Sequence, residues 1–271
     1  MPVQRINGID LAYQDDGQGE PVVLVMGSGA EGRVWRAHQT PALRAAGYRT
    51  VTFDNRGIPP TDCSGGFTVD DLVADTVGLI EYLGLERCRL VGTSMGAHVV
   101  QELCLARPDL VHQAVFMATR GRTDAMREEA SLAERQLLDS GVRLPPRYAA
   151  TVQAMQFLSP RTLDDDRGIR DWLDILELSA DAAHTPGYRA QLELDVMPDR
   201  LADYGSITAP CLVVGFADDL VLPPHLSREV AEAVPGARYV EIPDAGHFGY
   251  LEQPELVNKE LLSFFQSGTS V

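Results

Sequence analysis

The sequence has little lysine, little cysteine and no long apolar run. Lys259 is the only lysine among 271 residues and lies in a predicted polar C-terminal helix, which leaves no plausible phosphate-binding lysine of a P-loop and no plausible Schiff-base lysine. The four cysteines stand far apart without a C-x-x-C pair, and no disulfide framework is indicated. No apolar run reaches about 18 residues, and the opening MPVQRINGID lacks a signal-peptide pattern. We therefore expect a cytoplasmic protein.

Basic residues are also scarce relative to acidic ones. The chain has 23 Lys and Arg against 39 Asp and Glu, a formal net charge of −16. Such a surface repels phosphate backbones and anionic lipid headgroups. We expect neither nucleic acid nor a membrane as a partner, and the simplest consequence of the charge is solubility.

Strand and helix patterns alternate over most of the chain. An Asn7-Gly8 turn predicts an N-terminal hairpin, and residues 119–205 show only helical periodicity. Alternation of this kind builds a parallel sheet covered on both faces. We predict an α/β fold with a mostly parallel, doubly wound sheet: a core domain of residues 1–118 and 206–271, interrupted by an inserted helical cap of residues 119–205. The predicted core strands after the hairpin are 22–26, 48–54, 87–92, 113–117, 211–216 and 237–242.

The glycines that follow the first buried strand, from Gly27 to Gly32, have the spacing of a dinucleotide-binding loop. Asp54 ends the next apolar run, where a ribose-binding carboxylate would stand. However, Glu31 would place a negative charge where the pyrophosphate should bind, and Pro41 would truncate the helix whose N-terminus should receive it. We therefore expect no nicotinamide cofactor.

The segment GTSMG places Ser94 between a predicted strand and a predicted helix, which is the context of a nucleophile elbow. Sterics explain why the flanking residues are Gly92 and Gly96. The sharp turn strains the serine backbone and brings neighbouring chain so close that side chains must be nearly absent. A serine hydroxyl needs a base, itself oriented by a carboxylate, to become a nucleophile. Ser94 is thus the candidate nucleophile.

The base and its carboxylate are expected in the last third of the chain. His247 lies in the loop PDAGHFGYLEQP after a predicted strand, where it can reach a serine at the carboxyl edge of the sheet. Counting from Gly215 favours Asp218 as the carboxylate, whereas counting back from Pro223 favours Asp219, which we choose. The other histidines lack this placement and lack metal-ligand spacing, so we expect no metal: His38, His98, His112, His184 and His225.

Taken together, an N-terminal hairpin, GTSMG, an acid loop and DAGH, in the order Ser, Asp, His, resemble α/β-hydrolase fold enzymes with a helical cap. The resemblance is to the esterases and cofactor-free haloperoxidases of that family, and it covers nearly the whole chain except the cap. It implies that the backbone N–H groups of Ser28 and Met95 form the oxyanion hole. It also implies that Asp54 and Arg56, in FDNRG, brace the loops around the site.

Two segments depart from the family pattern. Met26 replaces the histidine that precedes the oxyanion glycine, which leaves the backbone donor intact. The segment from Ile58 to Thr61 replaces the usual Gly-x-Ser, and its two prolines stiffen one wall of the pocket.

Our hypothesis is a serine hydrolase that acts on an ester, thioester or lactone of a mostly apolar small molecule, free or held on a carrier protein, without a cofactor. Alternatives are acyl transfer, cyclisation, elimination or C–C hydrolysis by the same triad in a bacterial secondary-metabolite pathway, or a non-catalytic small-molecule binding protein on this fold. The apolar cap residues could line the pocket or form the cap's own core. The residues expected at the substrate are Gly27, Trp35, Met126, Met155, Trp172 and Phe248.

Overall fold

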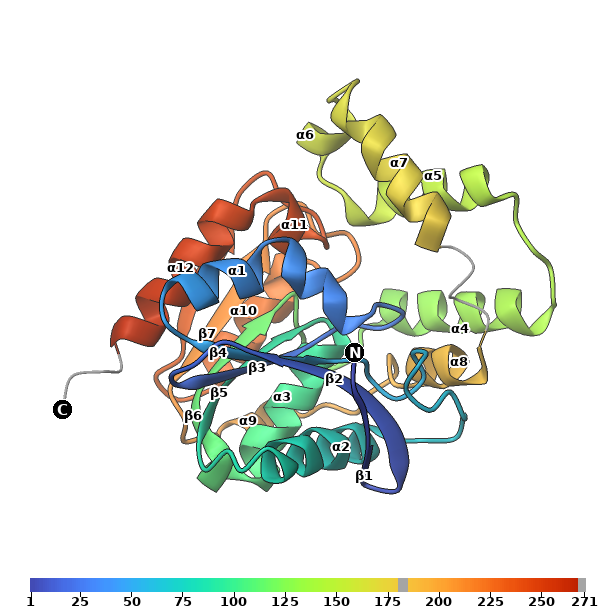
Figure 1. Ribbon diagram of the computed structural model, residues 1–271. Coiled ribbons are helices and arrows are strands. Elements are labelled where there is room, and N and C mark those ends of the chain that lie inside the picture. Colours follow the sequence, from blue (N-terminus) through green and yellow to red (C-terminus); the bar gives the residue numbers. More distant parts are fainter. Residues whose placement is uncertain (180–184, 268–271) are drawn as a thin grey trace.

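The centre of the molecule is an eight-stranded sheet with the order β1-β2-β4-β3-β5-β6-β7-β8 (Figure 1). The computed structural model describes residues 1–179 and 185–267. β1 (Val3–Ile6) and β2 (Ile9–Asp16) form an antiparallel hairpin at one edge, with Asn7 and Gly8 both at positive φ as the turn requires. β2 pairs antiparallel with β4, and the remaining pairs are parallel. The other strands are β3 (Pro21–Val25), β4 (Arg49–Phe53), β5 (Cys88–Thr93), β6 (Val111–Met117), β7 (Cys211–Phe216) and β8 (Arg238–Ile242).

Helices cover both faces of the sheet, which explains why its central strands read as continuous apolar runs. In β3, Val23 and Val25 pack on one face, whereas Val22 and Leu24 pack on the other. α2 (Val69–Tyr82), α3 (Met95–Ala106) and α10 (Pro224–Ala233) contribute to the first core; η1 (Gly32–Ala37), α1 (Gln39–Ala45), α11 (Gly249–Glu252) and α12 (Pro254–Ser267) contribute to the second. A short 3-10 helix, η2 (Pro108–Leu110), leads into β6.

Between β6 and β7, the part of the chain that the structure describes contains helices and no strand. These helices are α4 (Ala125–Asp139), α5 (Pro146–Phe157), α6 (Pro160–Leu163), α7 (Gly168–Ser179), α8 (Pro186–Glu193) and α9 (Leu201–Tyr204). α5, α6 and α7 form a group set apart from α4 and α8 (Figure 1). His184 lies outside the described residues. None of the described helices is long and apolar enough to cross a membrane.

Candidate active site

The turn between β5 and α3 holds Ser94 in a strained conformation. Its φ is 55° and its ψ is −121°, unusual for a residue with a side chain. A Cβ on Gly92 would overlap the backbone of Gly96, and a Cβ on Gly96 would overlap the carbonyl oxygen of Val25. This confirms the steric reason for the two glycines. The Ser94 N–H donates to Met117 O at 3.0 Å, which ties the turn to β6.

Asp219 and His247 form a buried pair. Nδ1 of His247 lies 2.8 Å from Oδ2 of Asp219, and the two side chains are 6% and 0% exposed. Oδ1 of Asp219 accepts hydrogen bonds from the N–H groups of Val221 (2.8 Å) and Leu222 (2.7 Å), which fixes the carboxylate. Asp218 is half-buried, and its backbone N–H donates to the carbonyl oxygen of Ala245. The contact with His247 is therefore made by Asp219.

The three predicted side chains follow β5, β7 and β8, whose carboxyl ends meet at one edge of the sheet. The segment after His247 contacts the end of β3, because the Tyr250 hydroxyl donates to Met26 Sδ at 3.8 Å. A Cβ on Gly27, the residue after Met26, would lie 3.2 Å from Ser94 Cβ. The described residues form no hydrogen bond between Ser94 Oγ and His247. Such bonds are often long or poorly aligned before substrate binds, so this link stays a prediction.

The two expected oxyanion donors come from different segments: Ser28 lies in the loop after β3, and Met95 lies at the start of α3. Asn55 Nδ2 donates to Met26 O at 2.7 Å, and Gly29 N donates to Gln191 Oε1 at 2.8 Å. Within the described ranges, the N–H groups of Ser28 and Met95 donate to no other residue. Met95 begins α3, so its N–H has no intrahelical acceptor. Their role as an oxyanion hole stays a prediction.

Gln191 is a residue that the sequence did not reveal. It lies on α8, is fully buried, and also donates from Nε2 to Arg56 O at 2.7 Å. Its side chain therefore joins the cap to two core loops. No motif marks it, and its partner Gly29 stands 162 positions away.

Asp54 and Arg56 brace the surroundings of the site in different ways. Asp54 Oδ1 accepts from Gly32 N at 2.7 Å, which holds the loop after β3. Burial raises the pKa of Asp54 to about 6, and the Gly32 hydrogen bond opposes part of this rise. Arg56 pairs with Asp75 of α2 through two bonds of 2.9 and 2.7 Å. It therefore anchors its own loop to a helix.

The loop of His247 is attached to the junction of α5 and α6. Phe248 N donates to Phe157 O at 3.1 Å, and the Phe157 ring meets the His247 ring edge-to-face at 5.4 Å. Glu252 accepts two backbone hydrogen bonds: Oε2 accepts from Gly246 N at 2.7 Å, and Oε1 accepts from Ser159 N at 2.8 Å. A shift of this part of the cap would therefore move the imidazole.

The residues expected at the substrate lie in four different surroundings. Gly27 faces Ser94, and Phe248 stacks on Trp172 with ring centroids 6.3 Å apart. Met126 and Met155, on α4 and α5, are exposed, and their contact with substrate stays a prediction. Trp35 is a correction: it is fully buried against Tyr250, at 5.1 Å. It packs in the second core and has no exposed surface.

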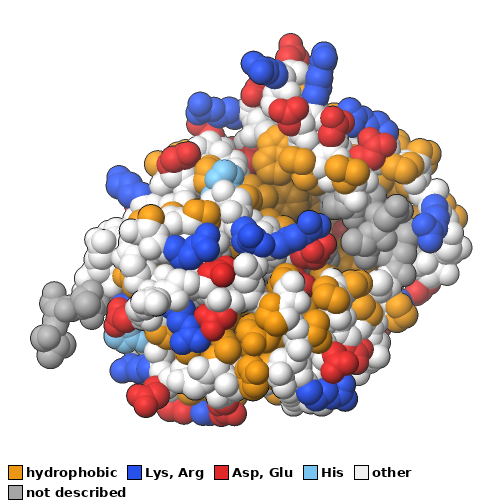
Figure 2. Space-filling view, viewed as in Figure 1, with side chains coloured by type: hydrophobic (Ala, Val, Ile, Leu, Met, Phe, Trp, Pro, Cys, Tyr) orange, Lys and Arg blue, Asp and Glu red, His pale blue; other side chains and the backbone are white. Residues whose placement is uncertain are grey.

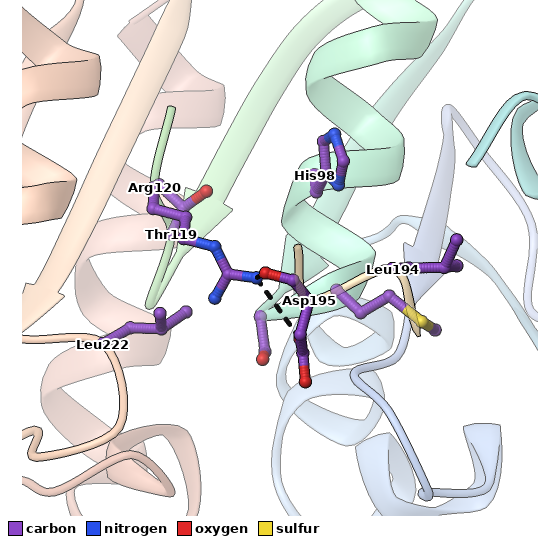
Figure 3. A pocket seen from close by; sticks show the side chains of 8 residues that line it. His98, Thr119, Arg120, Leu194, Asp195 and Leu222 are labelled. Atoms are coloured by element: carbon purple, nitrogen blue, oxygen red, sulfur yellow. Dashed lines mark hydrogen bonds and ion pairs between the residues drawn. The ribbon is translucent and has the colours of Figure 1, made fainter. Parts of the chain in front are cut away.

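Two cavities open on this region. The smaller, of about 10 Å³, has room for about one water, and Figure 3 shows the side chains that line it. They include Ser94, Met95, His98, Arg120, Asp195 and Leu222. The larger, of about 320 Å³, shares His98 with the first and extends past Glu102 and Arg200. Burial raises the pKa of Glu102, but His98 and Arg200 outweigh it and lower the pKa to about 2.

A hollow lies on the face shown in Figure 2, beneath α5, α6 and α7, and hydrophobic side chains gather on its walls.

Among residues 1–179 and 185–267, no three His, Cys, Asp or Glu side chains come together in a way that could hold a metal ion. The loop after β3 leads into the 3-10 helix η1, so a pyrophosphate would find no long helix N-terminus there.

Comparison with known proteins gives consistent matches over nearly the whole chain. The model of the Alpha/beta hydrolase family matches residues 22–260. The chain is 51% identical over 259 residues to the putative non-heme bromoperoxidase BpoC of Mycobacterium tuberculosis, covering 96% of this chain and 98% of that protein. The crystal structure of BpoC superposes with a TM-score of 0.93 at 50% identity and covers 96% and 97% of the two chains.

More distant relatives carry hydrolase names. A putative carbamate hydrolase RutD of Azorhizobium caulinodans is 27% identical over 272 residues, covering 97% of this chain and 98% of that protein. The structure of a thermophilic esterase from Thermogutta terrifontis is similar with a TM-score of 0.84 at 27% identity, covering 97% and 95%.

Proposed function

Because the chain belongs to the alpha/beta hydrolase family, we propose that it is a serine hydrolase that cleaves an ester, thioester or lactone through an acyl-enzyme on Ser94. The observation that carries this proposal is the buried 2.8 Å pair of Asp219 and His247. The pair stands at the sheet edge where Ser94 is held at a φ of 55°. A buried carboxylate against one nitrogen of a histidine is the arrangement that prepares the other nitrogen to act as a base.

In the proposed mechanism, Asp219 accepts a hydrogen bond from Nδ1–H of His247, which keeps the proton on Nδ1 and the lone pair on Nε2. Nε2 takes the hydroxyl proton of Ser94 as Oγ attacks the acyl carbon. The electron pair of the carbonyl moves to oxygen, where the N–H groups of Ser28 and Met95 stabilise it. Collapse expels the alcohol or thiol, which takes the proton from His247. Water then repeats the sequence and releases the acid.

The oxyanion donors supply a large part of the expected rate. One such donor is worth roughly 10² to 10³ in kcat. Asn55 and Gln191 hold the loop that carries Ser28, so this donor is fixed before substrate arrives. Met95 adds the positive end of the α3 dipole.

We assign residues 119–205 as a lid over this site and the hydrophobic hollow of Figure 2 as the place of the apolar part of the substrate. The exposed side chains of Met126 and Met155, 67% and 53% exposed, support this, because exposed apolar patches often mark binding surfaces. Trp172 and Phe248 would form one wall.

Ester hydrolysis tests the proposal. Purified protein is assayed on p-nitrophenyl esters from acetate to octanoate, beside Ser94→Ala and His247→Ala variants whose folding is checked by circular dichroism. We expect turnover by the wild type and a loss of about 10⁴-fold or more in both variants. Undiminished turnover by Ser94→Ala would contradict the proposal. A wild type that is inert toward all esters would favour the non-catalytic binding protein.

A second reaction follows from the name of the 51% identical relative. If hydrogen peroxide replaces water as the acceptor, the acyl-enzyme releases a peroxy acid, which can oxidise bromide to a brominating species. Acetate, peroxide and bromide should then brominate a diketone reporter with the wild type and not with Ser94→Ala. Bromination that persists in Ser94→Ala would exclude this route.

A further inference from the structure

The small cavity beside Ser94 is bounded by a buried arginine (Figure 3). Its walls come from the start of α3, the segment after β6, the residues after α8 and the loop of Asp219. Arg120 and Asp195 face each other across one side of it, and a dashed line marks their contact in Figure 3. The cavity therefore joins the proposed nucleophile to a fixed positive charge.

Arg120 has more hydrogen-bond donors than the described residues satisfy. The residue is only 8% exposed. Nη2 donates to Asp195 O at 2.6 Å and lies 3.3 Å from Asp195 Oδ1. Nε is buried without a partner, and Nη1 donates to no residue in the described ranges. A guanidinium has five N–H groups and keeps its charge at any pH a protein tolerates.

Asp195 compensates this charge only in part. Its side chain is 28% exposed, so water screens its attraction for Arg120. The shorter contact of Arg120 goes to the backbone carbonyl of Asp195, which also accepts from Thr123 Oγ1 at 3.0 Å. Burying a guanidinium with most of its donors unmet is costly. An acceptor supplied by a ligand would remove that cost.

We propose that Arg120 forms a subsite for a carboxylate carried by the acyl group of the substrate. This inference rests on the proposed function, since it places the carboxylate relative to Ser94. A carboxylate is planar and matches the donor geometry of a guanidinium. The cavity has room for about one water, which suits a single ligand oxygen.

The position of the cavity also limits the length of the acyl group. Because Ser94 and Arg120 line the same small cavity, the carboxylate stands only a few bonds from the acyl carbon. The substrate class is therefore a half-ester or half-thioester of a short dicarboxylic acid, and the apolar hollow receives the leaving group. The net charge of −16 opposes the approach of such an anion, so its binding needs a dedicated cation.

The experiment compares two p-nitrophenyl esters of nearly equal shape. One is the hemisuccinate, and the other is the 4-methylpentanoate, whose isopropyl end replaces the carboxylate. We expect the wild type to favour the hemisuccinate in kcat/KM by about 10-fold or more. Arg120→Met should lower kcat/KM for the hemisuccinate by about 30-fold or more and change it less than threefold for the neutral ester. Asp195→Asn, which removes the competing carboxylate, should raise the preference for the hemisuccinate.

Arg122→Met is the matched control. Arg122 lies two positions away and pairs with Glu229 through bonds of 2.8 and 2.7 Å, outside the residues that line the cavity. It should leave the ratio between the two esters unchanged. A wild type that favours the neutral ester, or an Arg120→Met variant that loses both activities equally, overturns the subsite. The wild-type ratio decides even if a variant fails to fold. Hydrolysis of the neutral ester by the wild type, abolished in Ser94→Ala, would leave the proposed function intact.

Discussion

Replacing Asp219 by asparagine changes one atom of the proposed charge system and leaves the loop in place. Oδ1 of the amide can keep the hydrogen bonds from Val221 and Leu222, at 2.8 and 2.7 Å. The reverse orientation would set an NH₂ group against two N–H donors, so the amide nitrogen must face His247. It then donates to Nδ1, the imidazole proton moves to Nε2, and Nε2 can no longer accept the proton of Ser94. A base held in the wrong tautomer costs about 10⁴-fold in kcat, about 5 kcal/mol of transition-state stabilisation.

Steady-state hydrolysis of p-nitrophenyl acetate and urea unfolding measure both consequences. We expect Asp219→Asn to lose about 10⁴-fold in kcat and about 1 to 2 kcal/mol in the free energy of unfolding. Asp218→Asn is the matched control: it adjoins the same position, lacks the contact with His247, and should stay within about twofold of wild-type kcat. The reasoning is refuted if Asp219→Asn keeps more than a tenth of the activity, or if Asp218→Asn loses as much.

Three further predictions concern the supports of the site. Glu252→Gln sets an amide NH₂ group against the Gly246 N–H and should displace the loop that carries His247. We expect kcat to fall about 10- to 100-fold while the melting temperature changes little. An unchanged kcat would contradict this. Gln191→Met leaves Gly29 N–H unpaired and should cost about 2 to 4 kcal/mol in urea unfolding; a loss below about 0.5 kcal/mol would exclude the clamp. Because burial raises the pKa of Asp54 from 3.8 to about 6, the native state binds more protons than the unfolded state in that range and stability falls as pH rises through it. The stability of Asp54→Asn relative to wild type should therefore rise by about 2 kcal/mol from pH 4 to pH 7, and a pH-independent difference would refute this.

The elements set by local chemistry could be predicted from the sequence. The Asn7-Gly8 turn needs positive φ, and the close packing of the turn at Ser94 requires Gly92 and Gly96. A short segment of sequence is therefore enough to predict each of these turns. The alternation of strand and helix patterns likewise indicated the sheet, because its central strands β3, β5 and β7 are buried and mostly apolar. The choice between Asp218 and Asp219 was harder, because the backbone hydrogen bonds that select Asp219 form only in the folded loop.

The supports of the site depend on contacts between distant segments. Gln191, Glu252 and Arg120 sit in helices or loops with no motif, and their partners are set by how the cap docks on the core. Trp35 illustrates the opposite error: an aromatic next to a functional loop suggests a pocket wall, yet the second core encloses it completely. Composition and spacing do not state which side of a loop a side chain occupies.

The most direct test of the account is covalent labelling of the folded protein by a fluorophosphonate, followed by peptide mass spectrometry. A serine is phosphonylated rapidly only when a neighbouring base makes it nucleophilic. The account predicts a single modified residue, Ser94, with a labelling rate that falls at least about 100-fold in His247→Ala. Labelling of another residue, or a folded wild type that resists the reagent, would contradict it.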